Sequence, residues 1–236
     1  AWYDNIPMVS WMLLRAKCRG CALPISAQYP IVELVVGILW LLAAVHYGAT
    51  FAALRVAIFA TIMLGIAVTD AKHYLIPDGF TVSGLVFVMV TSMVAVFRGE
   101  PGPFAEPYDA LVGACAGAGA VAIVGWLGEV VLKKEAMGFG DVTLMAVVGA
   151  AVGPTRSLLV LFIGAALGAF AFIGVVYPVV KLRGAPRGDQ IDLGLEAPRA
   201  ELPEVPFGVF LAPAAILVLV WGETLIAWYS SQFLGV

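Results

Sequence analysis

Three aspartates lie in two short polar segments between long apolar stretches of the sequence. Asp70 and Asp78 begin and end the segment 70–78 (DAKHYLIPD), and Asp141 ends the sequence GFGD. Two carboxyl groups that share a proton can act as acid and base, one activating water while the other protonates or polarises a carbonyl group. Asp70 and Asp141 therefore predict hydrolysis of a peptide bond by an aspartic mechanism, unless Asp70 is simply a solvated loop acid.

The neighbours of these aspartates have simpler explanations. Asp78 follows Pro77 and precedes an apolar stretch, so we expect it to cap that helix, with a supporting role in catalysis as the alternative. Gly138 and Gly140 remove side chains around Asp141, which allows unusual dihedral angles and the close approach of an extended peptide. GxGD alone is a weak pattern, and a plain turn explains it equally well.

The helix ends near Asp70 and Asp141 are expected to give the two carboxyl groups different pKa values. Asp70 closes a predicted helix over 51–69, where the negative end of the helix dipole disfavours a carboxylate. Asp141 opens a predicted helix over 142–153, where the positive end favours one. We expect the two side chains to face each other across the ends of two adjacent helices, with Asp141 the more readily ionised.

The composition places these aspartates in a membrane protein. Hydrophobic residues make up 62% of the 236 residues and charged residues only 12%, with a net charge of −3. Ordinary soluble domains are about 25% charged. These values exclude a disordered chain, a basic nucleic-acid-binding protein and a disulfide-rich secreted module. We expect the lipid bilayer, and no nucleic acid, as a partner.

Seven apolar segments predict an all-α, polytopic transmembrane bundle. A bilayer core of about 30 Å needs about 20 residues of helix. The segment 142–153 is short and rich in glycine and alanine, so a buried or half-penetrating helix is its alternative. Glycines at GxxxG spacing are expected to pack helices together: Gly113, Gly117, Gly164 and Gly168. The candidate spans are 31–48, 51–69, 79–97, 109–131, 142–153, 157–180 and 207–229.

Basic residues predict which face of the membrane carries the aspartates. With seven spans, ten of the 13 lysines and arginines fall on the side that holds residues 1–30, 70–78, 132–141 and 181–206. Because lysine and arginine are retained in the cytoplasm, that side is predicted to be cytoplasmic. The proline-containing segment 181–206 is predicted to be a flexible linker on the same side.

The residues now described resemble a known family, the type IV prepilin peptidases of the GxGD aspartyl protease class. Residues 3–33 (YDNIPMVSWMLLRAKCRGCALPISAQYPIVE) are similar to the cytoplasmic segment of that family. DAKHYLIPD and GFGD are similar to its two aspartate motifs, in the same order. The resemblance implies that Asp70 and Asp141 are the catalytic pair and that Asp78 is a supporting residue.

The same resemblance implies the substrates, the cofactor and the location. Such enzymes cleave a short basic leader from type IV prepilins and pseudopilins, and methylate the new N-terminus from S-adenosylmethionine. They lie in the bacterial inner membrane with the active site at the cytoplasmic face. The family's first span is expected to be missing from this sequence. We divide the chain into a cytoplasmic segment, 1–30, and a membrane-embedded peptidase domain, 31–236.

Cys18 and Cys21 form a CxxC pair on the predicted cytoplasmic side, where a stable disulfide is not expected. One CxxC supplies half of a tetrahedral zinc site. Family members with a four-cysteine arrangement have another CxxC upstream, so zinc is expected only in a longer protein. The sequence contains no glycine-rich βαβ unit for S-adenosylmethionine, and we place methyl transfer only in segment 1–30.

Two other functions are compatible with parts of the sequence. Glu129 and Glu223 lie within apolar spans and could mark the ion path of a small transporter or channel. That function predicts acids near the middle of several spans, and it leaves the stretch 3–33 unexplained. A purely structural membrane subunit leaves the paired aspartates unexplained as well.

Overall fold

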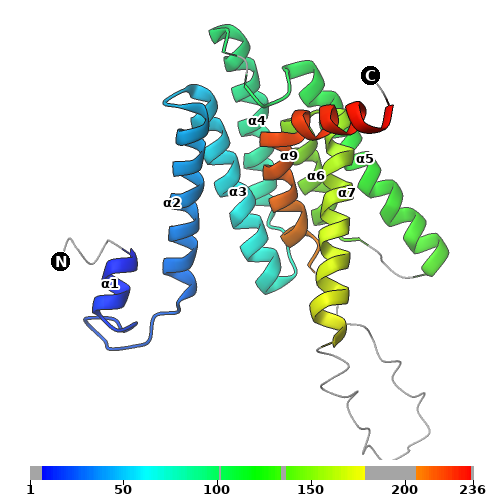
Figure 1. Ribbon diagram of the computed structural model, residues 1–236. Coiled ribbons are helices and arrows are strands. Elements are labelled where there is room, and N and C mark those ends of the chain that lie inside the picture. Colours follow the sequence, from blue (N-terminus) through cyan, green and yellow to red (C-terminus); the bar gives the residue numbers. More distant parts are fainter. Residues whose placement is uncertain (1–6, 101, 134–136, 179–205, 235–236) are drawn as a thin grey trace, which may run out of the picture.

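The structure is a computed structural model that describes residues 7–100, 102–133, 137–178 and 206–234. In these residues the chain is helical, and its β-structure is a single bridge between Lys17 and Pro24. The predicted linker 181–206 lies, except for its last residue, outside the described part. The helices, shown in Figure 1, are α1 (Pro7–Leu13), α2 (Gln28–Tyr47), α3 (Phe51–His73), α4 (Asp78–Arg98), α5 (Pro107–Leu132), α6 (Phe139–Val152), α7 (Pro154–Ala171) and α9 (Gly208–Tyr229), with π-helical turns η2 (Phe172–Val176) and η3 (Ser230–Leu234).

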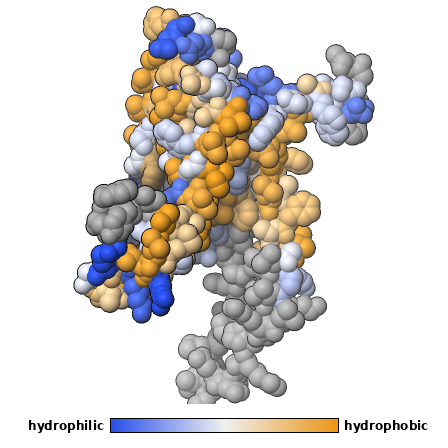
Figure 2. All heavy atoms as spheres, turned by 60° about the vertical axis from the view of Figure 1, so that its left-hand side comes forward, coloured by the Kyte–Doolittle hydropathy of each residue, from blue (hydrophilic) through white to orange (hydrophobic). Residues whose placement is uncertain are grey.

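The prediction of a polytopic helical bundle is confirmed. Among the described residues, six helices are long and apolar enough to cross a bilayer, and the shorter α6 is the seventh apolar helix. Hydrophobic side chains cover most of the side of the bundle, and strongly hydrophilic ones gather towards its ends (Figure 2). Because so large an apolar surface is unstable in water, the chain is a multi-pass membrane protein.

Helix α6 is the buried centre of the bundle. It packs against α4, α5, α7 and α9, and nearly all of its residues from Leu144 to Val152 are buried. Its 14 residues are about 21 Å long at 1.5 Å per residue, which is shorter than a bilayer core. Of the two alternatives for 142–153, a helix surrounded by protein is therefore correct.

Glycines allow the close packing around α6. Gly113 of α5 lies against the carbonyl oxygen of Gly149 in α6, and Gly117 lies against that of Met145, so that a Cβ at either position would collide with backbone. A Cβ at Gly164 of α7 would lie 2.8 Å from Leu211 Cδ2 of α9, and one at Gly168 would contact Phe210. All four glycines predicted to pack helices do so.

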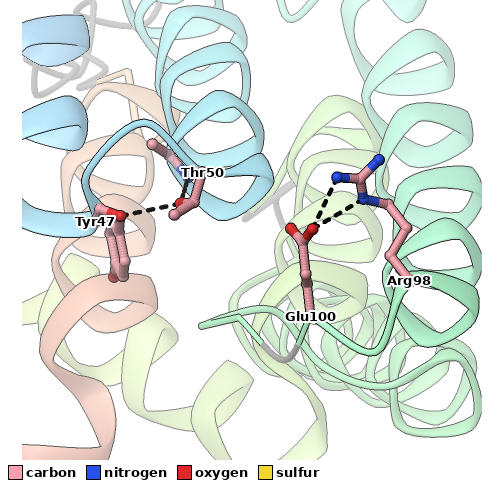
Figure 3. Close-up of polar contacts among 5 residues, drawn as sticks. Tyr47, Thr50, Arg98 and Glu100 are labelled. Carbon is pink, nitrogen blue, oxygen red and sulfur yellow. Dashed lines mark hydrogen bonds and ion pairs between the residues drawn. The ribbon is translucent and has the colours of Figure 1, made fainter.

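Short polar contacts close the turns at the end of the bundle away from Asp70 (Figure 3). The Thr50 hydroxyl donates to the Tyr47 carbonyl oxygen at 3.0 Å and accepts the Ala53 N–H, which caps α3. Arg98, the last residue of α4, forms an ion pair with Glu100 at 2.8 Å. In Figure 1 the opposite end of the bundle carries α1, the last turn of α3 and the first turn of α9.

Candidate active site

Asp70 lies in the last turn of α3, which continues beyond its predicted end at residue 69 to His73. Tyr74 ends the helix in the left-handed region (φ 52°), and its N–H donates to the Asp70 carbonyl oxygen at 2.9 Å. Asp70 is only 5% exposed and is the only buried acidic residue in the described part of the chain. The alternative of a solvated loop acid is therefore wrong.

The first turn of α9 faces the carboxyl group of Asp70. Burial disfavours the negative charge of this carboxyl group, and the N–H groups of Gly208 and Val209, which are directed at it, offset part of that effect. The approach is so close that a Cβ at Gly208 would lie 2.8 Å from Asp70 Oδ2. Oδ2 is itself buried and has no hydrogen-bond partner among the described residues. The atom is thus available to a proton or to a water molecule of the reaction.

Asp141 lies in the first turn of α6, directly after the loop that precedes this helix. Gly138 is the N-cap, and its carbonyl oxygen accepts the Asp141 N–H at 3.1 Å. Burial, and after it the negative charge of Asp70, raises the pKa of Asp141 to about 6, whereas the Gly138 N–H opposes this rise. Asp141 is therefore suited to hold a proton in mildly acidic solution.

The expectation from helix ends was wrong for Asp141. This residue does lie at the N-terminal end of α6, but its pKa is raised rather than lowered. A helix end stabilises an exposed carboxylate by about 0.3–1 kcal/mol, less than the roughly 1.36 kcal/mol that moves a pKa by one. Burial and the nearby Asp70 charge outweigh this contribution.

The structure brings Asp70 and Asp141 together, since the charge of one acts on the other. Their helices are not adjacent as expected: within the described residues α3 and α6 do not pack directly, and α4 and α9 each pack against both. Helix α9 thus bridges the two aspartate-bearing helices. The last span, which hydropathy alone predicted, is part of the site.

Ile76 and Gly208 are site residues that the sequence analysis missed. Ile76, which belongs to the segment 70–78, is buried, and it would contact a Cβ at Gly140 (3.0 Å from its own Cβ) and one at Gly208 (3.1 Å from its Cδ1). The signal in the sequence was the run Pro206, Phe207 and Gly208, which places a glycine where a polar segment meets an apolar one.

The supporting residues differ in part from their predicted roles. Asp78 is the first residue of α4 and exposed, while Pro77 holds the N-cap position and no side chain caps the helix. The predicted cap was therefore wrong, although the helix dipole still favours an acidic side chain in the first turn. Neither Gly138 nor Gly140 has a positive φ. Gly140 instead leaves room for Ile76.

Cys18 and Cys21 lie in a tight turn beside the bridge between Lys17 and Pro24. The Cys18 N–H donates to the Leu23 carbonyl oxygen at 2.8 Å. The N–H groups of Cys21 and Gly20 face the Cys18 sulfur and lower the pKa of this thiol. Both thiols are free, and no group of three or more suitable ligands for a metal occurs in the described residues. Within the described residues the pair therefore offers two thiols and no complete metal site.

The acids that suggested an ion path do not line one. Glu129 is exposed on α5. The side chain of Glu223 is 84% exposed, and its Oε1 lies 3.5 Å from Arg156 Nη1. Both therefore lie on the surface of the bundle, and a transporter or channel is not favoured.

Comparison with known proteins indicates a peptidase, as the paired aspartates do. Residues 57–173 match the type IV leader peptidase family, and residues 1–47 match the bacterial peptidase A24 N-terminal domain. Three similar proteins carry the name prepilin leader peptidase/N-methyltransferase. That of Aeromonas hydrophila is 31% identical over 98% of this chain and 71% of its own length. That of Stutzerimonas stutzeri is 34% identical over 97% of this chain and 70% of its own length. That of Pseudomonas aeruginosa is 33% identical over 99% of this chain and 71% of its own length.

No solved structure matches the chain. The similarity to these relatives nevertheless extends over 98% and 99% of this chain. The chain belongs to the type IV leader peptidase family.

Proposed function

We propose that this chain is an aspartic endopeptidase that removes the basic leader from type IV prepilins and pseudopilins and then methylates the new N-terminus. The observation that carries the proposal is the interaction between the buried Asp70 and the half-buried Asp141. The name of the relatives, prepilin leader peptidase/N-methyltransferase, supports both reactions. Asp78, Gly138 and Gly140 are supporting residues in this proposal.

In the proposed mechanism, water is the nucleophile and the two aspartates divide the proton transfers. Asp70, whose charge the α9 N–H groups stabilise, accepts a proton as water attacks the scissile carbonyl carbon. Asp141, whose pKa is raised, donates its proton to the carbonyl oxygen. When the tetrahedral intermediate collapses, Asp70 gives its proton to the leaving nitrogen and Asp141 takes back the proton of the hydroxyl group, which restores both aspartates. No covalent bond to the enzyme forms.

The proposed location is the bacterial inner membrane, with the active site at the cytoplasmic face. Among the described basic residues, Arg15, Lys17, Arg19, Lys72 and Lys133 lie in or beside segments that the positive-inside rule assigns to the cytoplasm. The leader of a prepilin lies on this side, so it reaches the aspartates without crossing the bilayer. The peptidase domain in this proposal is 31–236, and 1–30 is a separate cytoplasmic segment.

The methyl donor in this proposal is S-adenosylmethionine, which would supply an electrophilic methyl group. The described part of segment 1–30 contains α1 and the cysteine turn, and it forms no βαβ unit that would bind this cofactor. We assign methyl transfer to this segment. Cys18 and Cys21 would hold a zinc ion only if two further ligands complete the site.

The function is tested by incubating membranes that contain the protein with a prepilin and measuring the mass of the product. Leader cleavage predicts a mass loss equal to the leader, and methylation adds about 14 Da when S-adenosylmethionine is present, the mass of one CH₂. A protein that is folded and membrane-inserted yet leaves several prepilins and pseudopilins intact would contradict the proposal.

A further inference from the structure

Helix α9 begins without a capping side chain of its own. Its N-cap is Phe207, an apolar residue whose side chain accepts no hydrogen bond. The first four N–H groups of a helix have no partner within it and need an acceptor elsewhere. The Phe207 carbonyl oxygen accepts hydrogen bonds from the N–H groups of Phe210 at 3.0 Å and Leu211 at 3.1 Å. The N–H groups of Gly208 and Val209, which come before these two donors, are not bonded to this oxygen.

These two remaining N–H groups are directed at the carboxyl group of Asp70 on α3. A carboxylate is the group that best satisfies the positive end of a helix, and here it is supplied by another helix. Asp70 thereby caps α9 at the same time as it takes part in the catalytic pair. The orientation of this carboxyl group consequently depends on where α9 begins.

The close approach requires residue 208 to lack a side chain. A Cβ at this position would lie 2.8 Å from Asp70 Oδ2 and 3.3 Å from its Cγ, and the first of these distances is shorter than real Cβ contacts. Since Asp70 is only 5% exposed, the side chains and backbone packed around it restrict movement of its carboxyl group. Any larger residue would displace Asp70 or α9.

We propose that Gly208 is a positioning residue for proteolysis: it lets the first turn of α9 hold the Asp70 carboxyl group facing Asp141. The proposal rests on the aspartic peptidase function proposed above. It adds the last helix to the site and gives the backbone of 208–209 a defined task.

The first test is Gly208→Ala, assayed for prepilin cleavage in purified, detergent-solubilised enzyme. We expect kcat to fall by roughly 10- to 100-fold because a displacement of about 1 Å is enough for such a loss, while KM changes little. The matched control is Gly222→Ala on the same helix, where a Cβ would lie 2.9 Å from Val218 Cγ1 and 3.2 Å from Arg156 Cδ. It crowds side chains but no catalytic group, so kcat should stay near that of the wild type.

The second test removes one of the two donors, because the ring Cδ of proline takes the place of the amide hydrogen. Val209→Pro lacks the N–H group, and proline is tolerated in the first turn of a helix. We expect it to lower kcat, whereas Val209→Ala, which keeps the donor, should not. Wild-type kcat in Val209→Pro, or equal kcat losses in Gly208→Ala and Gly222→Ala, would overturn the proposal.

A double variant distinguishes the effect of displacing Asp70 from the effect of crowding Ile76, the other neighbour of residue 208. A Cβ there would also lie 3.1 Å from Ile76 Cδ1, and Ile76→Val removes that methyl group. If displacement of Asp70 causes the loss, Ile76→Val should not rescue Gly208→Ala; full rescue would overturn the proposal. Every comparison is made against the wild-type enzyme. If the proposed function is wrong, the wild type itself will not cleave prepilin, and this outcome differs from any result that contradicts the role of Gly208.

Discussion

The two aspartates differ in their surroundings, and this difference assigns their roles. Burial acts on both carboxyl groups, but N–H groups from another helix face that of Asp70, whereas the negative charge of Asp70 acts on that of Asp141. Replacing either by Asn keeps the shape but removes the ability to exchange a proton. We expect Asp70→Asn and Asp141→Asn to lower the rate of leader cleavage by several orders of magnitude, measured as leader-length mass loss.

Asp78→Asn is the matched control for this pair because it changes the same atoms on an exposed residue. It should keep partial activity. An Asp141→Asn protein with appreciable activity would refute the aspartic mechanism.

The pH dependence of cleavage follows from the raised pKa of Asp141. Its proton is present below a pH of about 6 and is lost as the pH rises through that value. At still lower pH, Asp70 is protonated too and can no longer act as the base. We therefore expect a bell-shaped profile of kcat/KM whose alkaline limb begins near pH 6 and falls tenfold per pH unit. A rate that is constant from acid to strongly alkaline pH would exclude a pair that shares one proton.

At the scale of the helices, the site depends on how closely α5 approaches α6. A Cβ at Gly113 would collide with the Gly149 carbonyl oxygen, whereas nothing lies within 4 Å of a Cβ at Gly119 on the same helix. Overpacking of a close contact costs about 1–3 kcal/mol. We expect Gly113→Ala to lower the thermal unfolding temperature in detergent by several degrees and Gly119→Ala to leave it unchanged or slightly raised.

This pair of variants also tests whether α6 positions Asp141. Because α6 carries Asp141 in its first turn, a shift of this helix should lower cleavage more than stability alone explains. Equal melting temperatures for the two variants would show that α5 and α6 are less closely packed than described.

For the whole molecule, the proposed sidedness predicts which residues a reagent reaches from outside. Cys21 is exposed in the turn that follows α1, and α1 lies at the same end of the bundle as the last turn of α3, which carries Asp70 (Figure 1). Glu100 lies in the α4–α5 turn, at the opposite end. In a Glu100→Cys protein, a membrane-impermeant maleimide added to spheroplasts should label the introduced thiol but label Cys21 only after permeabilisation. Labelling of Cys21 first would invert the topology and place the aspartates outside.

The order of the two reactions follows from the chemistry of the nitrogen that is methylated. Before cleavage this nitrogen is an amide, whose lone pair is delocalised into the peptide bond. Cleavage releases an amine with a pKa of about 7.7–8.0, which is partly neutral and nucleophilic near neutral pH. Asp70→Asn and Asp141→Asn should therefore not methylate intact prepilin, yet they should transfer labelled methyl groups to pilin that is already cut. Loss of both activities in a folded variant would show that they share one site.

The sequence by itself determined the elements and the chemistry. Apolar length and spacing give the seven helices to within a few residues at most ends, because in lipid the backbone must satisfy its hydrogen bonds within each helix. Asp70 and Asp141 were identifiable because acids are costly near a membrane, and the packing glycines because small residues recur at helical spacing.

Tertiary structure decided what surrounds the aspartates. Burial raises the pKa of Asp141 against the helix-end effect, and Ile76 and Gly208 reach the site with side-chain and backbone contacts that the aspartate motifs alone do not reveal. Hydropathy could not reveal that α9 rather than α6 lies directly beside α3, because it gives the length of a span and not its neighbours. Contacts between distant segments depend on which side chains fit together in three dimensions, and only the folded chain contains that information.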